Sequence, residues 1–185
     1  MSLQGAAAAL LLRRPAHGYE LQATLDAELG PLWTTRASQL YVTLGRMQRD
    51  GLVTVTRVNQ PNRPDRQLLS LTVRGRECAD AWLMRGDRAE ERVARLAVAR
   101  VAAPDRFEAV AAAIVRDLNS RLRQLRAMRA DAASGFQPEA LESEIMEVQT
   151  SLRWTAAVRD RSGEILARPL AAPAPHASVD ERSSA

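Results

Sequence analysis

The residues best suited to chemistry lie in one stretch, residues 36–53, whose apolar and polar side chains separate onto two faces. Leu40, Tyr41, Leu44 and Met47 recur at steps of one, three and three, the spacing of a stripe along one helix. The opposite face carries mostly hydroxyl, amide and guanidinium groups, from Ser38, Gln39, Val42, Thr43, Arg46 and Arg49. Such groups meet base edges and phosphate oxygens. The stretch predicts a DNA recognition helix, or an ordinary amphipathic helix packed under a hairpin.

The segment after this helix predicts a β-hairpin. Asp50 and Gly51 end the helix, because glycine tolerates the left-handed conformation that follows a helix end. Residues 53–59 and 66–71 are the expected strands, and residues 60–65, with two prolines and an asparagine, the expected turn. A helix that runs directly into a hairpin is typical of a winged helix-turn-helix. The candidate DNA contacts of this wing are Arg57, Asn62, Arg63 and Arg66; the alternative is a plain surface hairpin.

Charge is concentrated in the same region. All 26 basic residues are arginines, and eight of them fall between Arg36 and Arg76 against two acids, a local net charge of +6. The whole chain carries +4, so the remainder nets −2. A basic module on a nearly neutral body favours binding to nucleic acid, with a solvated basic face as the alternative.

Shorter helices are expected on both sides of this region. Residues 2–14 predict a first helix, broken at Pro15, and residues 17–29 a second, ended by Gly30 and Pro31. Thr34 or Thr35 would cap the third helix and Thr72 a fourth, which reaches Met84 with Cys78, Ala81 and Trp82 inward. Residues 1–84 are therefore expected to form the winged helix-turn-helix domain.

The second half predicts long helices that pair. An Asp87–Glu90 capping box opens a helix to about residue 101. Residues 105–132 then form a helix whose heptad seam is Phe107, Ala111, Ile114, Leu118, Leu125 and Met128. Residues 138–167 form the last helix, with a stripe of Leu141, Ile145, Val148 and Leu152. Residues 85–168 would be a helical dimerisation domain and residues 169–185 a disordered tail.

The two long apolar stripes imply a partner. A second copy of the chain is the simplest one, and a symmetric dimer would place two recognition helices about 34 Å apart, which predicts a palindromic DNA target. The alternative is a monomeric hairpin of helices folded on itself.

Several classes of function are disfavoured by composition. One cysteine and two histidines build neither a disulfide framework nor a structural zinc site, so we expect no metal and no cofactor. No catalytic triad spacing, phosphate-binding glycine loop or paired histidine is present, so we expect no enzyme. No apolar run approaches the roughly 20 residues of a membrane span, and the short run 5–12 lacks the flanks of a signal peptide. We therefore expect a cytoplasmic protein without a membrane partner.

Four segments in series resemble the PadR family of transcriptional regulators. They are residues 15–21 (PAHGYEL), 39–47 (QLYVTLGRM) and 50–53 (DGLV), then Leu71 and Thr72 with Gly75 and Arg76. The resemblance covers about residues 5–84; the C-terminal half is similar to the family only in its helical layout. It implies a mainly α fold with a small β-hairpin wing, in a dimeric winged helix-turn-helix that is usually a repressor released by a small molecule.

The resemblance also assigns roles to single residues. Arg36, Ser38, Gln39, Thr43 and Arg46 would face the DNA, with Tyr41 reaching a phosphate or packing. The sequence departs from the family at Leu68 and Leu69, where tyrosines are common, and at Ala37 and Ser38, where proline or glycine is common.

Four further residues have two interpretations each. Trp82 and Trp154 are the candidate ligand-binding residues, because flat aromatic molecules stack on tryptophan; alternatively both fill a dimer core. His17 is expected in a structural turn rather than as a proton switch, and Cys78 as an inert thiol rather than a redox sensor. The sequence as a whole favours a homodimeric DNA-binding repressor relieved by a small molecule. The alternative is a helical protein–protein adaptor that does not bind DNA.

Overall fold

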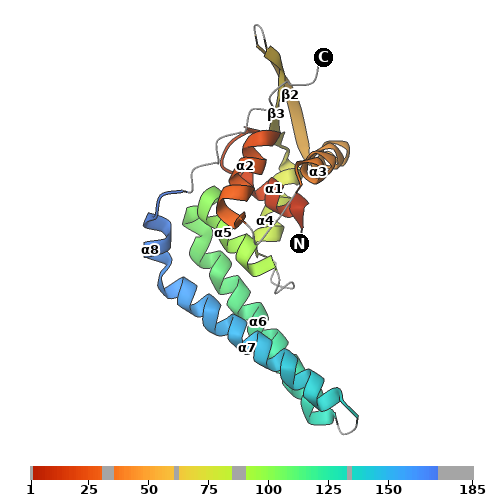
Figure 1. Ribbon diagram of the computed structural model, residues 1–185, viewed down its shortest axis with the longest axis vertical. Coiled ribbons are helices and arrows are strands. Elements are labelled where there is room, and N and C mark those ends of the chain that lie inside the picture. The colour runs from red at the N-terminus through yellow and green to blue at the C-terminus, as the bar shows by residue number, and fades with distance from the viewer. Residues whose placement is uncertain (1, 31–35, 61–62, 85–90, 133–134, 171–185) are drawn as a thin grey trace, which may run out of the picture.

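The computed structural model describes residues 2–30, 36–60, 63–84, 91–132 and 135–170; for residues 58–60 and 63–66 it describes the backbone alone. Figure 1 shows a bundle of short helices beside a small sheet, with a two-helix arm extending from one end and a β-hairpin from the other. In chain order the elements are α1 (Leu3–Leu10), β1 (Ala16–His17), α2 (Gly18–Leu29), α3 (Ala37–Arg49), β2 (Val53–Gln60), β3 (Arg63–Leu71), α4 (Val73–Met84), α5 (Arg92–Ala102), the 3-10 turn η3 (Pro104–Arg106), α6 (Phe107–Asp131), α7 (Gln137–Asp160) and α8 (Ser162–Ala167).

The first half is a winged helix-turn-helix, as predicted. The apolar stripe of α3 faces the core, because Leu40 and Met47 are fully buried and Leu44 is 5% exposed. Strands β2 and β3 form the predicted wing, and β1 adds a third, antiparallel strand on the other side of β3. Strand β1 was not predicted, since two residues beside a proline carry no alternating pattern.

Helix α3, the wing and α4 are connected by hydrogen bonds of Gly51 and Leu52, which together form the joint at Leu52. Gly51 adopts a positive φ of 69°, and the backbone N–H of Leu52 returns to the Met47 carbonyl at 2.8 Å, which ends α3. The backbone N–H of Thr72 donates to the Leu52 carbonyl at 3.0 Å. The Thr72 hydroxyl donates to the Gly51 carbonyl at 2.8 Å and accepts from the Gly75 N–H at 3.0 Å, which confirms Thr72 as the cap of α4.

Two boundaries in the first half differ from the predictions. Helix α1 stops at Leu10 instead of residue 14, because its last turn tightens and Leu12 bonds back to the Ala9 carbonyl. The predicted turn at residues 60–65 is shorter, since β3 already begins at Arg63 and pairs it with Gln60. A register shift between Val58 and Gln60 accompanies this pairing, and Pro64 lies in the strand next to it, as prolines in sheets often do beside bulges.

The arm is an antiparallel pair of helices, α6 and α7, packed along each other (Figure 1). The predicted seam of α6 is buried at Phe107, Ala111, Ile114, Leu118 and Leu125, but Met128 is 53% exposed and was wrongly assigned to it. Of the predicted α7 stripe only Val148 is buried, and Leu141, Ile145 and Leu152 are half-buried. Two helices cover only the sides that face each other, so the distal apolar residues stay open.

Two helix boundaries in the second half were also misplaced. The helix expected from residue 105 starts as the 3-10 turn η3, and the α-helix begins at Phe107. The last helix, expected to reach residue 167, ends at Asp160, and α8 follows after Arg161 in a non-helical conformation. Gly163 lies close to this break, where its weak helix propensity favours interruption.

Arg100 of α5 links α8 and the residues that follow it to α2 in the first half. Its Nη1 pairs with Glu28 of α2 at 2.7 Å, and both side chains are nearly buried. Its Nε donates to the Ile165 carbonyl at 3.0 Å, and its Nη2 donates to the carbonyls of Arg168 and Pro169. Pro169, which was expected in the tail, is therefore anchored, and residues 171–185 lie outside the described residues.

Other expectations also lie outside the described residues, namely the caps at Thr34 and Thr35 and the capping box from Asp87 to Glu90. Within the described part of the chain, no helix combines the length and apolar character that crossing a membrane requires. The same residues contain no group of three or more histidines, cysteines or acids placed to hold a metal ion.

We predict that Gly75→Ala destabilises the protein. A Cβ at residue 75 would lie 2.0 Å from the Leu52 carbonyl oxygen and 2.9 Å from Leu71, so backbone must move. Overpacking of this kind costs about 1–3 kcal/mol. Chemical denaturation should show a lower midpoint.

Gly163→Ala is the matched control, because a Cβ there meets no atom within 4 Å among the described residues. It should leave stability equal or slightly higher. Equal midpoints for Gly75→Ala and the unaltered protein would contradict the close approach at Leu52.

Candidate nucleic-acid interface

The outer face of α3 is open to solvent. Six of the polar or aromatic side chains that the sequence singled out are exposed, namely Arg36, Ser38, Gln39, Tyr41, Arg46 and Arg49. They project from a helix whose other side is fixed in the core by Leu40, Leu44 and Met47. This combination gives the arginines and the amide a rigid base and free access to a large partner.

Thr43 differs from its neighbours. It is half-buried, and its hydroxyl donates to the Gln39 carbonyl one turn earlier, at 2.8 Å. Its proton is therefore engaged within the helix, and toward a base the hydroxyl offers an acceptor rather than a donor. Thr43 remains a predicted contact at the edge of the face rather than at its centre.

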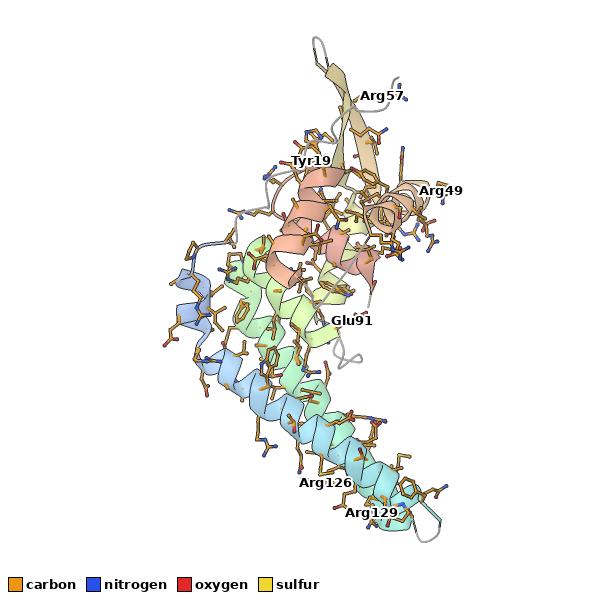
Figure 2. All side chains as sticks on the ribbon, viewed as in Figure 1. Tyr19, Arg49, Arg57, Glu91, Arg126 and Arg129 are labelled. Carbon is orange, nitrogen blue, oxygen red and sulfur yellow. The ribbon has the colours of Figure 1, made fainter. Side chains whose placement is uncertain are left out.

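The wing supplies one described arginine to the same region. Arg57 of β2 is exposed, and Figure 2 shows it on the hairpin, beyond the helix that carries Arg49. Arg63 and Arg66 belong to β3, but their side chains lie outside the described residues, as does the whole of Asn62. Their predicted contacts with DNA stay predictions.

A hollow of about 360 Å³ separates α3 from the wing. Tyr41 and Gln48 of α3, Tyr19 of α2 and Gln67 of β3 contribute to its walls. The hollow thus lies between the helix and the hairpin.

The turn before α2 sets the position of one of these walls. One ring nitrogen of His17, Nδ1, lies 2.9 Å from the Gln67 carbonyl of β3, and its ring stacks on that of Tyr19 with centroids 5.5 Å apart. A Cβ on Gly18 would come within 2.9 Å of the Tyr41 ring, so the glycine leaves room for that tyrosine. These contacts agree with the structural role expected of His17, and Tyr41 packs here while remaining 53% exposed.

Arg74 was not anticipated as part of the site. Its Nη1 donates to the Asp50 carbonyl at 3.0 Å, at the C-terminal end of α3. A cation at this end complements the helix dipole and ties α4 to α3. The sequence shows only that Arg74 lies between Thr72 and Gly75. That position gives no indication of a hydrogen-bond partner 24 residues earlier in the chain.

The two candidate ligand-binding tryptophans have different surroundings. Trp82 is 8% exposed, touches Gly5 of α1, and donates its indole N–H to buried Glu91 at 3.0 Å. The second oxygen of Glu91, Oε1, accepts from the Ser2 N–H at 2.6 Å. Trp154 is 38% exposed on α7, with the Arg92 guanidinium 5.6 Å from its ring centroid. Trp82 therefore fills the core, and Trp154 keeps a surface that a flat molecule could cover.

Comparison with known proteins identifies the first half of the chain. Residues 9–81, from α1 to α4, match the family model described as the transcriptional regulator PadR-like family. This part of the chain is therefore similar to that family.

Two relatives each match less than half of the chain. A probable transcriptional regulator of Mycobacterium tuberculosis is 32% identical over 83 residues, which cover 45% of this chain and 44% of the relative. The negative transcriptional regulator PadR of Bacillus subtilis is 28% identical over 76 residues, covering 41% and 42%. The match spans less than half the length of either relative. The crystal structure of Bacillus subtilis PadR with operator DNA has a TM-score of 0.44 and 18% identity, covering 86% of this chain and 98% of that chain.

The structure explains why the PadR-like segments contain the residues they do. His17 and Glu20 build the turn before α2, Gly18 admits Tyr41, and Gly51, Thr72 and Gly75 build the joint at Leu52. These residues hold the outer face of α3 in place without belonging to it.

In this turn the pKa of the Glu20 carboxyl is shifted. Burial alone would raise the pKa of its carboxyl. The His17 backbone N–H, at 2.7 Å from Oε2, and the Arg14 guanidinium, at 3.2 Å from Oε1, outweigh that effect, so the pKa lies below its usual value of 4.5.

We predict that Glu20→Gln destabilises the protein at neutral pH by about 1 kcal/mol, the scale of a partly exposed charged hydrogen bond. A lowered folded-state pKa stabilises the fold above the unfolded pKa, and this contribution is lost as pH falls through the folded value. The difference between Glu20→Gln and the unaltered protein should therefore shrink below about pH 4 in denaturation experiments.

Glu77→Gln is the control, because Glu77 is exposed on α4 and forms no ion pair among the described residues. It should change stability little at any pH. A Glu20→Gln difference that stayed constant from pH 7 to pH 3 would contradict the hydrogen bonds assigned to the carboxylate.

Proposed function

We propose that this protein is a homodimeric, sequence-specific DNA-binding transcriptional regulator whose helix α3 enters the major groove. The observation that carries the proposal is the outer face of α3, where exposed arginines and an amide stand on a buried apolar stripe next to a projecting wing. The PadR-like domain, shared with two proteins described as transcriptional regulators, supports it.

The side chains divide into two roles by their chemistry. Gln39 has the paired donor and acceptor that suit an adenine, and Arg46 the paired donors that suit the O6 and N7 of guanine. Arg36, Arg49 and Arg57 carry charges that suit phosphates on either side. The Tyr41 hydroxyl, above the depression between helix and wing, would bind a backbone oxygen.

We propose that the protein represses transcription. The Bacillus subtilis relative is described as a negative transcriptional regulator. A dimer held on a palindromic operator would block access to that DNA. A flat aromatic effector stacked on Trp154 would relieve this repression by changing the separation of the two α3 helices.

The arm offers a surface for a second copy. Its exposed apolar side chains include Met128, Phe136 and Met146. Exposed arginines of α6 face solvent at 121, 123 and 126, and exposed glutamates of α7 at 139, 142, 144 and 147; Figure 2 shows Arg126 and Arg129 near the far end of the arm. A two-fold axis would set the basic helix of one copy beside the acidic helix of the other.

The same apolar side chains keep an adaptor function as the second candidate. A protein–protein adaptor would use Phe136 and Met146 but would not depend on the arginines of α3. Binding to duplex DNA measured across a salt series separates the two, because only phosphate contacts produce a steep slope.

We predict that Arg46→Ala weakens binding to a duplex selected by the unaltered protein by about tenfold, the effect of removing one bidentate pair of hydrogen bonds to a base. If Arg46 instead binds phosphate, the slope of log affinity against log salt should become shallower by about 0.9 for each phosphate that is no longer neutralised. Fluorescence anisotropy over a salt series measures both quantities.

Arg116→Ala on α6 is the matched control, since it also removes an exposed arginine from a helix and is not among the arginines proposed to face a second copy. It should leave both affinity and slope unchanged. Unchanged affinity and slope for Arg46→Ala would contradict the placement of α3 in the groove.

We predict that Met146→Glu weakens self-association at least tenfold, because Met146 is 57% exposed on α7 and a charge there would be buried in the dimer. Sedimentation velocity over a concentration series measures this effect. Val73→Glu, which changes an even more exposed apolar residue, on α4, should not alter it. A monomer at all concentrations in the unaltered protein would contradict the dimer.

A further inference from the structure

One of the most outward positions of α3 is occupied by an apolar residue. At 100° per residue, Val42 lies about 200° around the helix from buried Leu40, and Ser38 and Arg49 lie within roughly 40° of Val42. Val42 is 61% exposed. It therefore stands at the centre of the face proposed to meet DNA, among polar neighbours.

The fold gives no reason for a valine at this place. A β-branched residue has lower helix propensity than alanine, leucine, arginine or glutamine. Its exposure means that it recovers little of this cost by burial within the chain. Leu40, Leu44 and Met47 already provide the contacts that fix α3 to the core.

The neighbours of Val42 leave its methyl groups accessible. Gly45 is one turn further along the helix, and a Cβ built there would meet only the Arg49 guanidinium, at 3.9 Å. Ser38 is one turn earlier and is short. The valine methyls therefore have small residues one turn before and one turn after them. The longer side chains of Gln39, Arg46 and Arg49 lie to either side on the same face.

We propose that Val42 reads thymine, through contact between its methyl groups and the thymine C5 methyl in the major groove; this inference rests on the proposed function. Thymine is the only DNA base that presents a methyl group in the major groove, and apolar side chains recognise it there. The valine also disfavours the N4 amino group of cytosine, because it offers that donor no acceptor in exchange for water.

The test is a double-mutant cycle between protein and DNA methyl groups. A duplex is first selected from a random-sequence pool by the unaltered full chain. Each thymine of the half-site is then replaced by uracil, which removes only the C5 methyl, and binding is measured for the unaltered protein and for Val42→Ala. Alanine favours the helix, so this variant should fold; circular dichroism verifies that.

Burial of one methyl group predicts about a fourfold effect. At one thymine per half-site, uracil should weaken binding of the unaltered protein by about threefold to tenfold and binding of Val42→Ala by less than twofold. Val73→Ala, a matched exposed valine on α4, should retain the full sensitivity to uracil.

Failure of the Val42 assignment and failure of the proposed function would give different results. Tight, salt-dependent binding with no thymine that couples to residue 42 would overturn the assignment of Val42 and leave the proposed function standing. The absence of any salt-dependent complex with duplex DNA would overturn the proposed function and the assignment together.

Discussion

The tightest constraint on helix α3 is the approach of Gly75 to the Leu52 carbonyl, with no room for even one additional carbon. That carbonyl lies where α3 has ended and the wing begins, and Thr72 binds the same segment through its backbone and its hydroxyl. Helix α4 therefore rests directly on the backbone between α3 and β2. The orientation of α3 relative to the wing depends on this joint, because several hydrogen bonds over so short a connection leave little freedom for either element to rotate.

The outer face of α3 gains from this rigidity. Side chains that bind a partner lose less conformational freedom on binding when their helix is already fixed. The buried stripe, the joint at Leu52 and the His17 turn each position the helix without occupying its outer face. The fold thus separates the residues that hold the helix from the exposed residues of its outer face.

Sequence patterns predicted α3 and the wing well, because a helical stripe and an adjoining pair of strands are local features. They missed β1, whose two residues pair with Leu68 and Leu69 far along the chain, and they placed Met128 in a seam where it stays exposed. The exposure of Ser38, Gln39 and Arg46 followed from periodicity. The inward direction of Trp82 was also predicted, but its contact with Gly5 and the engaged hydroxyl of Thr43 were not, since both depend on packing geometry rather than on residue type.

Arg100 changes how the arm should be regarded mechanically. Its guanidinium grips α2 through Glu28 and the backbone beyond α7 through three carbonyls, so the chain from residue 100 to residue 169 closes on itself. The arm is therefore attached to the helical bundle at both of its ends, where the chain enters α6 and where it returns after α7. A lysine could not brace it in the same way, because a single ammonium lacks the flat, forked set of donors that reaches four acceptors at once.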